Sequence, residues 1–406
     1  MPAERTTVIE PRYSPALPEP PAALRAALRS PLGTAPLRAL ARPGQRVAIS
    51  VCDVTRPAPR RAVLAAIFEE LAGVRPEDIV ILIATGTHRA NTRPELEEML
   101  GPDILARYRV VNHDARERSS LADLGHTGTG VPVLLNREWT EADLRLTTGV
   151  VEPHFFAGFS GGPKMVAPGL AGLDTVLALH DAAHIGHPRA TWGITAGNPV
   201  HDDVREIART TGVHFSLDVT LNDRQEITGV FAGELFAAHA AACAAARAVA
   251  MQPVAEPFEV VITSNSGYPL DQNLYQAVKG MSAAAQVVKE GGVIVCAAEC
   301  QDGLPAHGSY ARILASQPSP QELLAMIGTA GYSEPDQWQV QVQARIQMKA
   351  RVLLKAGRLS AAQLRAAKLE PTEDVTKAAR EALAAAGPEA RLCVLPAGPK
   401  TIPYLA

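Results

Sequence analysis

The sequence has no marked excess of either charge, no long hydrophobic run and no arrangement of cysteines that would cross-link it. Its 39 basic and 42 acidic residues leave a formal net charge of -3, which gives no electrostatic case for binding nucleic acid or an anionic membrane. Because no run of about 18 apolar residues is present, no membrane-spanning helix is expected. The five cysteines lack CxxC spacing and indicate scattered thiols, not a disulfide framework or a zinc knuckle. A small molecule is therefore the expected partner.

Length and composition are those of a two-domain cytoplasmic protein. A chain of 406 residues, 47% of them hydrophobic, can bury two cores at the usual size of about 150 residues per domain. The N-terminal stretch MPAERTTVIEPRYSPALPEPP has six prolines and no signal-peptide hydrophobic core, so we expect it to form an extended arm. The oligomeric state has no signature in the sequence.

Strands and helices are expected to alternate along the first half of the chain. Apolar, β-branched runs predict strands at 46–52, 78–84, 108–112 and 144–151. Helices are predicted at 57–71 and 92–100, the second opened by a capping box of Thr92 and Glu95. This alternation predicts a parallel sheet with helices on both faces. A hairpin at 214–230, turning at Asn222-Asp223, and an alanine-rich helix at 235–250 follow.

The alternation restarts after residues 251–257. Strands at 258–263 and 292–297 flank a predicted helix at 273–289, and Ser319-Pro320-Gln321-Glu322 is typical of the start of another helix. The expected fold class is α/β with two domains, each a mainly parallel sheet flanked by helices, and with the active site in the cleft between them. The predicted division is 1–250, a hinge at 251–257, and 258–406; a return of the last residues to the hinge is compatible with it.

The segment VVEPHFFAGFSGGPKMVAP at 150–168 is the first candidate site. It follows a probable strand and carries His154, a glycine-rich loop and Lys164 within a few positions. The glycines permit backbone geometries that other residues resist, and Pro153 ends regular pairing. In open α/β sheets, ligands bind at the carboxyl edge of the strands, where this loop is expected.

Two further motifs should reach the same edge. DVTRP at 53–57 follows the first strand and supplies Asp53 and Arg56, a fork for carboxylate or phosphate. TGTHR at 85–89 follows the second strand and supplies His88. Each motif alone could be a helix cap, a surface arginine or a structural histidine. Two histidines, His88 and His154, after two strands of one sheet instead favour proton transfer near neutral pH.

Two familiar patterns offer alternative functions. GFSGG around Ser160 matches the nucleophile elbow of serine hydrolases, although loop residues separate it from the preceding strand. HDAAH places His180 and His184 four residues apart, as on one helix face of a zinc hydrolase, with His187 or His201 as a third ligand.

The second domain contributes a polar cluster near the start of its first helix. In YPLDQNLYQAVK, the spacing places Tyr275, Gln276 and Lys279 on one side of a helix, where they could hold a small carboxylate. An ordinary solvated helix face would look the same. Trp338 is either a core anchor or an aromatic lid.

Taken together, DVTRP, TGTHR, EPHFFAGFSGGPK and YQAVK occur in the order and spacing of one known family. From about residue 45 to residue 340 the chain resembles lactate racemase and its homologues, the nickel-pincer nucleotide enzymes. The resemblance implies a pyridinium-3,5-dithiocarboxylate mononucleotide with nickel, tethered through Lys164, with His180 as the nickel-ligating histidine. It implies that His88 and His154 exchange the substrate hydroxyl proton.

The same resemblance implies that Asp53, Arg56, Ser160, Gln276 and Lys279 contact the cofactor phosphate or the substrate, and that Trp338 lies near the cofactor. With neighbouring motif residues added, the predicted cofactor-binding residues are Asp53, Thr55, Arg56, Ser160, Gly161, Gly162 and Trp338, and the predicted substrate-binding residues are Arg56, Tyr275, Gln276 and Lys279. The first domain would bind the cofactor and the second would close over the substrate. The implied activity is a 2-hydroxyacid racemase or epimerase that works by proton-coupled hydride transfer through a 2-keto acid. Lactate, malate, an aromatic hydroxy acid or a sugar acid are possible substrates, and enzymes of cofactor synthesis are the implied partners.

Overall fold

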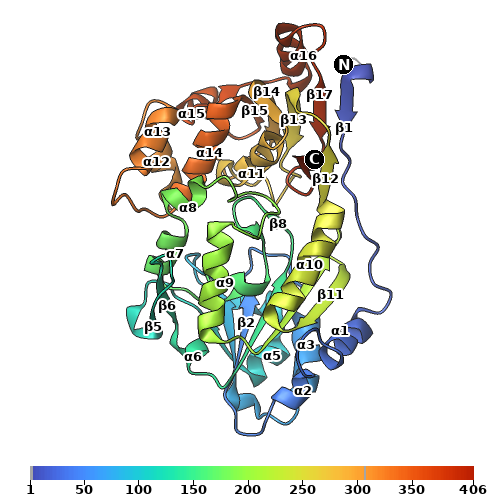
Figure 1. Cartoon of the computed structure of the whole chain (residues 1–406), viewed down its shortest axis with the longest axis vertical. Helices are drawn as coiled ribbons and strands as arrows, with labels where there is room; N and C mark the ends of the chain where they lie inside the picture. Colours follow the sequence, from blue (N-terminus) through green and yellow to red (C-terminus); the bar gives the residue numbers. More distant parts are fainter. Residues whose placement is uncertain (1–2, 306–307) are drawn as a thin grey trace. The chain divides into compact units, whose positions relative to one another are not determined.

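The structure is a computed structural model that describes residues 3–305 and 308–406 (Figure 1). The chain forms two compact units, each with its own sheet and core. Unit 1 comprises the N-terminal residues up to Arg12, the segment His180–Trp192 and residues Ala248–Ala406, and unit 2 comprises Tyr13–Leu179 and Gly193–Arg247. The segment His180–Trp192 thus belongs to unit 1, whereas the division predicted above places it in the first domain.

Unit 2 is built on a six-stranded sheet of order β11-β10-β7-β2-β3-β4. Its strands are β2 (Val47–Cys52), β3 (Ile79–Ala84), β4 (Arg109–Asn112), β7 (Leu144–Val150), β10 (Phe215–Leu221) and β11 (Ile227–Gly233). All neighbours pair in parallel except β10 and β11, which form the predicted hairpin. Because parallel strands share one carboxyl edge, the loops after β2, β3 and β7 emerge on the same side of the sheet.

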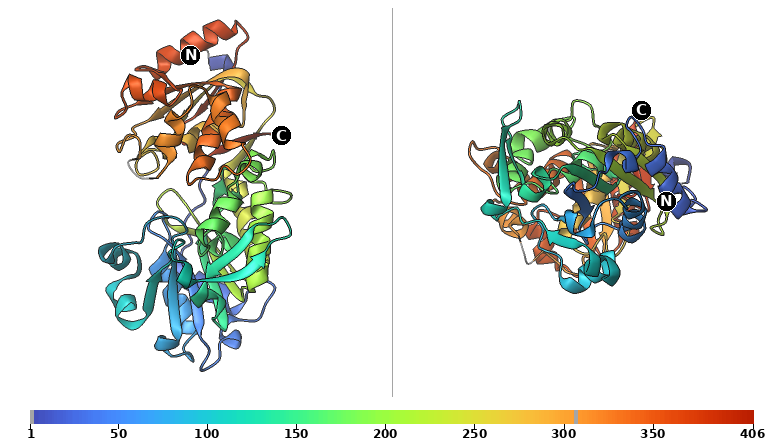
Figure 2. Two further views of the ribbon diagram at one scale, coloured as in Figure 1. Left: turned by 90° about the vertical axis from the view of Figure 1, so that its left-hand side faces the viewer. Right: turned by 90° about the horizontal axis from the view of Figure 1, so that it is seen from below.

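Helices cover both faces of this sheet (Figure 1; Figure 2). The alternation of side chains explains the layers, because Ile49 and Ile81 enter one buried cluster while Ala48 and Leu82 enter another. The helices of the first cluster are α1 (Pro20–Arg29), α2 (Leu37–Leu40), α3 (Arg60–Glu70), α4 (Arg93–Leu100) and α5 (Pro102–Arg107). Those of the second are α6 (Arg137–Thr140), α7 (Leu173–Leu179), α9 (Pro199–Thr211) and the start of α10 (Leu235–Ala250). Two small ribbons, β5–β6 (Leu121–His126, Pro132–Asn136) and β8–β9 (Pro153–His154, Gly158–Phe159), complete unit 2.

Unit 1 carries a second six-stranded sheet, entirely parallel, of order β1-β17-β13-β14-β15-β16. Its strands are β1 (Thr6–Val8), β13 (Phe258–Ser264), β14 (Val288–Ala298), β15 (Arg351–Ala356), β16 (Glu370–Pro371) and β17 (Leu392–Leu395). The buried cluster on one face includes residues of α11 (Leu274–Ala285), α12 (Tyr310–Ala315), α13 (Pro320–Ile327), α14 (Gln337–Lys349) and α15 (Ala361–Ala366), and α16 (Val375–Ala386) packs on the other. The short helix α8 (Ala182–Gly186) also belongs to unit 1, and β12 (Met251–Val254) pairs in parallel with β18 (Ile402–Leu405).

The predicted fold class is confirmed, since both sheets are mainly parallel and flanked by helices. The capping box of Thr92 and Glu95 is present, and all five cysteines are buried free thiols. The helix predicted at 273–289 is wrong at its C-terminal end, because the Val287 carbonyl accepts the Phe258 N–H and Val288 pairs with Phe258 in the sheet. Across the described residues, no helix combines the length and apolar character needed to cross a membrane.

Candidate active site

Asp53 and His88 meet at the carboxyl edge of the unit 2 sheet. They follow β2 and β3, and His88 Nδ1 lies 2.8 Å from Asp53 Oδ2. Burial raises the pKa of the Asp53 carboxyl, but the hydrogen bond and charge of His88, helped by Thr55 and Arg56, outweigh burial and leave the pKa below its ordinary value. The ionised carboxylate accepts the Nδ1 hydrogen, so Nε2 of a neutral His88 ring carries the lone pair. His88 is half exposed, with 53% of its side chain accessible, and can meet a substrate.

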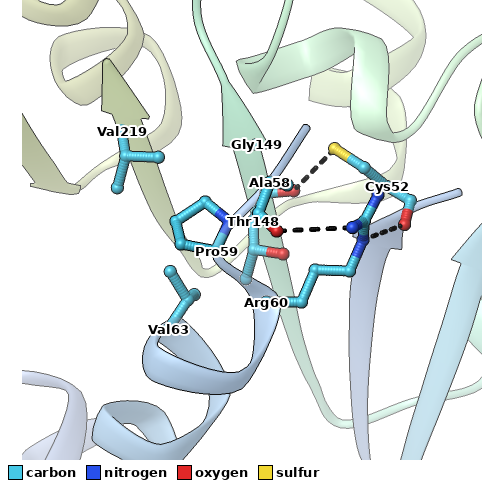
Figure 3. A pocket seen from close by; sticks show the side chains of 8 residues that line it. All are labelled: Cys52, Ala58, Pro59, Arg60, Val63, Thr148, Gly149 and Val219. Carbon is cyan, nitrogen blue, oxygen red and sulfur yellow. Dashed lines mark hydrogen bonds between the residues drawn. The ribbon is translucent and has the colours of Figure 1, made fainter. Parts of the chain in front are cut away.

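The loop that carries Asp53 is held by a buried arginine that sequence reasoning did not single out. Arg60, in the first turn of α3, donates Nε to Cys52 O at 2.8 Å, Nη1 to Ala58 O at 3.3 Å and Nη2 to the carbonyls of Asp53 and Arg56. Figure 3 shows this guanidinium beside a pocket of about 10 Å³, room for one water at most. Arg60 therefore fixes the backbone from residue 52 to residue 58.

Two other polar groups of this loop differ in their engagement. Thr55 donates its hydroxyl to Asp53 Oδ1 at 2.7 Å. The half-buried Arg56 guanidinium forms no hydrogen bond or ion pair with any residue that the structure describes. Arg56 is therefore available for an anionic ligand, whereas Thr55 orients the carboxylate.

His154 lies on the small β8–β9 ribbon that follows β7. Its Nδ1 accepts the backbone N–H of Ala157 at 3.3 Å and of Phe156 at 3.5 Å, so a neutral His154 ring carries its hydrogen on Nε2. The rings of Phe155 and Phe156 pack against it, with centroids 4.9 and 4.5 Å away. His88 and His154 are therefore held in opposite tautomers.

The glycine-rich loop places Lys164 close to this ribbon. Gly161 and Gly162 have φ of +70° and +50°, in the left-handed region that favours glycine. Lys164 sits in the short 3-10 turn Gly162–Met165, with its ammonium 5.7 Å from the centroid of the Phe156 ring. The loop carries one cationic amine on a backbone that other residues could not follow.

Ser160 is used by the loop itself. Its hydroxyl donates to Val150 O at 2.8 Å and accepts the Glu152 N–H at 3.0 Å, and only 8% of the residue is exposed. Among the described residues no imidazole bonds to this hydroxyl, since His239 bonds to the Ser160 carbonyl instead. The arrangement is not that of an activated serine nucleophile.

In unit 1, His180 and His184 do not share a helix. Helix α7 ends at Leu179, and Asp181 caps α8 by accepting the backbone N–H and Nδ1 of His184, each at 2.8 Å. The predicted pair of ligands on one helix face is therefore wrong, because the intervening aspartate stops one helix and starts the next. No group of three or more potential metal ligands gathers anywhere in the described ranges.

His180 instead packs against Trp338, which in turn is hydrogen-bonded to Tyr275. Its ring centroid lies 4.8 Å from that of Trp338, and Trp338 Nε1 donates to Tyr275 Oη at 3.1 Å. Helix α14, which carries Trp338, also holds the neighbouring backbone: Gln339 donates to Tyr275 O and Gln341 donates to Ala182 O. One helix thus positions two candidate site segments of unit 1.

Gln276 and Lys279 lie with Tyr275 on the half-buried side of α11, whose N-cap Asn273 accepts the Gln276 N–H at 3.1 Å. The structure therefore supports the predicted side-by-side placement of the three polar residues on one helix. Their position near the helix N-terminus favours an anionic ligand.

Comparison with known proteins gives consistent family matches along the chain. The chain matches the family models described as lactate racemase N-terminal domain over residues 1–193 and lactate racemase C-terminal domain over residues 254–402. It is 36% identical over 382 residues to a lactate racemase from Thermoanaerobacterium thermosaccharolyticum, covering 93% of this chain and 89% of the relative. A lactate racemase from Lactiplantibacillus plantarum is 36% identical over 374 residues, covering 91% and 88%.

Solved structures point the same way. The lactate racemase apoprotein from T. thermosaccharolyticum superposes with a TM-score of 0.93 at 34% identity, over 99% of this chain and 96% of that one. A Thermotoga maritima protein shares the fold, with a TM-score of 0.70 at 20% identity, over 96% of this chain and 98% of that one.

Proposed function

The chain belongs to the lactate racemase family and is a racemase, hence an isomerase, and we propose that it inverts the C2 centre of a 2-hydroxy acid with a nickel-pincer nucleotide attached to Lys164. The observation that carries the proposal is the pairing of two histidines in opposite tautomers with a lysine on a constrained glycine loop, all in unit 2. Lactate is the default substrate; malate, an aromatic hydroxy acid or a sugar acid would present the same reacting group.

The residues present fit such a cofactor. Lys164 offers an amine on a loop that is too tight for side chains at Gly161 and Gly162, and the Arg56 guanidinium forms no hydrogen bond or ion pair with the described residues. His180 offers an imidazole, a ligand type that suits nickel, beside the indole of Trp338. Asp53, Thr55, Ser160, Gly161 and Gly162 would complete the binding of the nucleotide. When bound, the group supplies a hydride acceptor that no protein side chain can replace.

Proton transfer falls to His88 and His154. Neutral His88 has its lone pair on Nε2 and can take the hydroxyl proton of one enantiomer, while His154 carries a hydrogen on Nε2 and can return a proton. In the reverse direction the two exchange roles. The ionised Asp53 carboxylate accepts the Nδ1 hydrogen of His88 and so holds the ring in the tautomer whose Nε2 is free.

The substrate carboxylate needs cationic and hydrogen-bonding side chains to hold it. Arg56 offers a guanidinium fork, and Lys279, Gln276 and Tyr275 line one side of a helix start. Holding the carboxylate while C2 becomes planar lets hydride return to either face. Loss of hydride gives a neutral 2-keto group, whereas loss of the C2 proton would build negative charge beside the carboxylate.

The proposal extends to a cytoplasmic location and to dependence on enzymes that synthesise the cofactor. Protein purified from a host without those enzymes would then lack activity whatever the state of its own residues.

The test is racemisation in D2O by protein co-expressed with the cofactor-synthesis enzymes. Each lactate enantiomer should be converted to the racemate, followed by chiral chromatography, with the C2 hydrogen retained. Substantial deuterium at C2 would contradict hydride transfer. If loaded protein racemises neither lactate nor any member of a panel of chiral 2-hydroxy acids, the proposed activity is wrong.

A further inference from the structure

The lysine-bearing loop rests on a buried carboxyl. Asp218 lies on β10 with no exposed surface, opposite Gly149 in the parallel pairing with β7. Its Oδ1 accepts the backbone N–H of Gly162 at 3.1 Å, two residues before Lys164. Burial raises the pKa of this carboxyl to about 7, while the bonds from Gly162 and Ser216 oppose the rise. Asp218 has no ion-pair partner in the described chain, and burying an unpaired carboxyl costs folding free energy. Its presence here therefore indicates a role in holding the loop backbone.

A buried imidazole holds the other end of the same loop. His239 on α10 is 2% exposed, and its Nε2 donates to the carbonyl of Ser160 at 2.9 Å. Burial lowers the pKa of His239 to about 4, so the ring is neutral at physiological pH and its hydrogen is committed to Ser160. Cys243, one turn later on α10, packs against this ring with its sulfur 3.5 Å from Nε2.

The loop passes so close to Asp218 and His239 that its glycines have no room for a side chain. A Cβ added at Gly162 would lie 2.4 Å from ring atoms of His239, closer than real Cβ atoms come, and one added at Gly161 would lie 3.1 Å from Asp218 Oδ1. The backbone of the loop therefore lies directly against both side chains. The glycines predicted from the sequence are required by this close approach as well as by their positive φ.

Lys164 interacts electrostatically with two buried histidines, His201 and His239. Burial is the main cause of the lowered pKa of His239 and of His201, and the Lys164 charge adds to it; the two rings stack with centroids 5.7 Å apart. Neutral imidazoles avoid the repulsion that cations would exert on the Lys164 ammonium. The charge state of these groups is thus compatible with a lysine held nearby.

We propose that Asp218 and His239 are positioning residues that hold the segment Ser160–Lys164, through the Gly162 N–H and the Ser160 carbonyl, so that Lys164 is presented for covalent attachment. Neither residue touches the substrate or the attached group in this account. The attachment itself rests on the proposed function, but the conformation of the loop does not.

The test compares paired substitutions that keep or lose each hydrogen bond. His239→Gln can still donate to Ser160 O, whereas His239→Asn is too short to reach it. Asp218→Asn keeps an acceptor for Gly162 N–H, whereas Asp218→Ala removes it. His113→Asn is the matched control, because His113 is also 2% exposed in unit 2 and donates Nε2 to a backbone carbonyl, that of Ala171, at 2.9 Å.

Two readouts are expected to move together. In unloaded protein, amide hydrogen exchange of peptides covering 158–165 should accelerate in His239→Asn and Asp218→Ala but not in His239→Gln, Asp218→Asn or His113→Asn. After co-expression with the cofactor-synthesis enzymes, intact mass should show roughly tenfold less adduct in the same two variants, a loss typical when a residue that orients a functional side chain is replaced.

The outcomes separate the two claims. Unchanged exchange at 158–165 in both bond-losing variants would overturn the positioning role, as would equal loss of adduct in His113→Asn. If wild-type protein from a competent host carries no adduct, the proposed function fails, while the exchange data still decide the role of Asp218 and His239.

Discussion

Asp53 determines which nitrogen of the His88 ring carries the hydrogen. Its carboxylate accepts hydrogen bonds from His88 Nδ1 and from the Thr55 hydroxyl. Because Asp53 is only 4% exposed, water does not compete readily for these bonds. A carboxylate in this position fixes which nitrogen of the imidazole is free to take a proton. Asp53 therefore determines the tautomer of His88 without contacting the substrate itself.

Asp53→Asn is expected to lower kcat of racemisation by about a hundredfold or more, the scale of a lost general base. The amide can donate to Nδ1, which moves the ring hydrogen to Nε2 and removes the free lone pair. KM should change less, and the melting temperature should stay close to that of Asp103→Asn, an exposed aspartate of unit 2. A steady-state comparison of the two variants checks this; equal kcat values would contradict the role of Asp53.

Among the secondary-structure elements, the connection from β2 to α3 depends on one side chain. Arg60 satisfies the carbonyls of Cys52, Asp53, Arg56 and Ala58 in a place that is only 8% exposed. Arg60→Met would keep most of the volume but remove every guanidinium hydrogen bond, so that the carbonyls of Asp53, Arg56 and Ala58 keep only their backbone donors. Because these bonds come from a charged group, we expect a cost of about 3 kcal/mol. Urea unfolding should show this loss, whereas Arg61→Met, its exposed neighbour, should stay within about 0.5 kcal/mol of wild type. Equal stability of the two variants would contradict the account.

Helix α14 makes a second prediction at this scale. The bond from Trp338 Nε1 to Tyr275 Oη joins it to α11. Trp338→Phe and Tyr275→Phe each remove that bond, so the double variant should lose less stability than the two single losses added together. A double-mutant cycle is expected to give a coupling of about 1 kcal/mol, and a coupling near zero would mean that the bond does not contribute.

For the whole molecule, acid should act on unit 2 through its buried histidines. Burial lowers the pKa of His201 to about 3 and of His239 to about 4, and it also lowers those of His113 and His214. Because these folded-state values lie below the unfolded value of 6.5, the stability they contribute is complete above pH 6.5. It is lost as the pH falls from 6.5 towards about 4.

Tryptophan fluorescence can follow this loss in one unit. Trp139, fully buried, is in unit 2, while Trp192 and Trp338 are in unit 1. Asp218, whose pKa is raised to about 7, acts in the opposite sense, because its protonation below pH 7 favours the folded state. In a Trp192→Phe, Trp338→Phe, Asp218→Asn background, which removes that carboxyl, the urea midpoint reported by Trp139 should fall between pH 7 and pH 5. Adding His239→Gln should weaken that fall, and a midpoint independent of pH in this range would contradict the pKa shifts.

Much of this architecture was predictable because local patterns and tertiary structure agree. Strands such as β2 and β3 are buried, β-branched runs, and the turn at Asn222 is capped by its own side chain, which accepts the N–H of Arg224 and Glu226. The proximity of Asp53 and His88 followed from the shared carboxyl edge of parallel strands.

The rest depends on contacts that no local pattern encodes. The segment from His180 joins unit 1 through bonds such as Gln341 to Ala182 O and Trp192 to Ser282, whose partners lie far away in sequence. Asp218 lies in β10, where Ser216, Asp218 and Thr220 alternate with apolar residues, a pattern that is equally typical of a strand with one solvated face. His239 is a polar residue in an alanine-rich helix, where an exposed position is equally compatible with the sequence. Their role becomes visible only once the glycine loop lies on top of them.

Attachment of the nickel nucleotide to Lys164 can be measured on the intact protein. Wild-type protein and Lys164→Ala would be purified from a host that co-expresses the cofactor-synthesis enzymes, and intact mass and nickel content would be determined for both. We expect a mass increment with bound nickel in wild type and neither in the variant. Unmodified, nickel-free wild-type protein from a host shown to make the cofactor would contradict it.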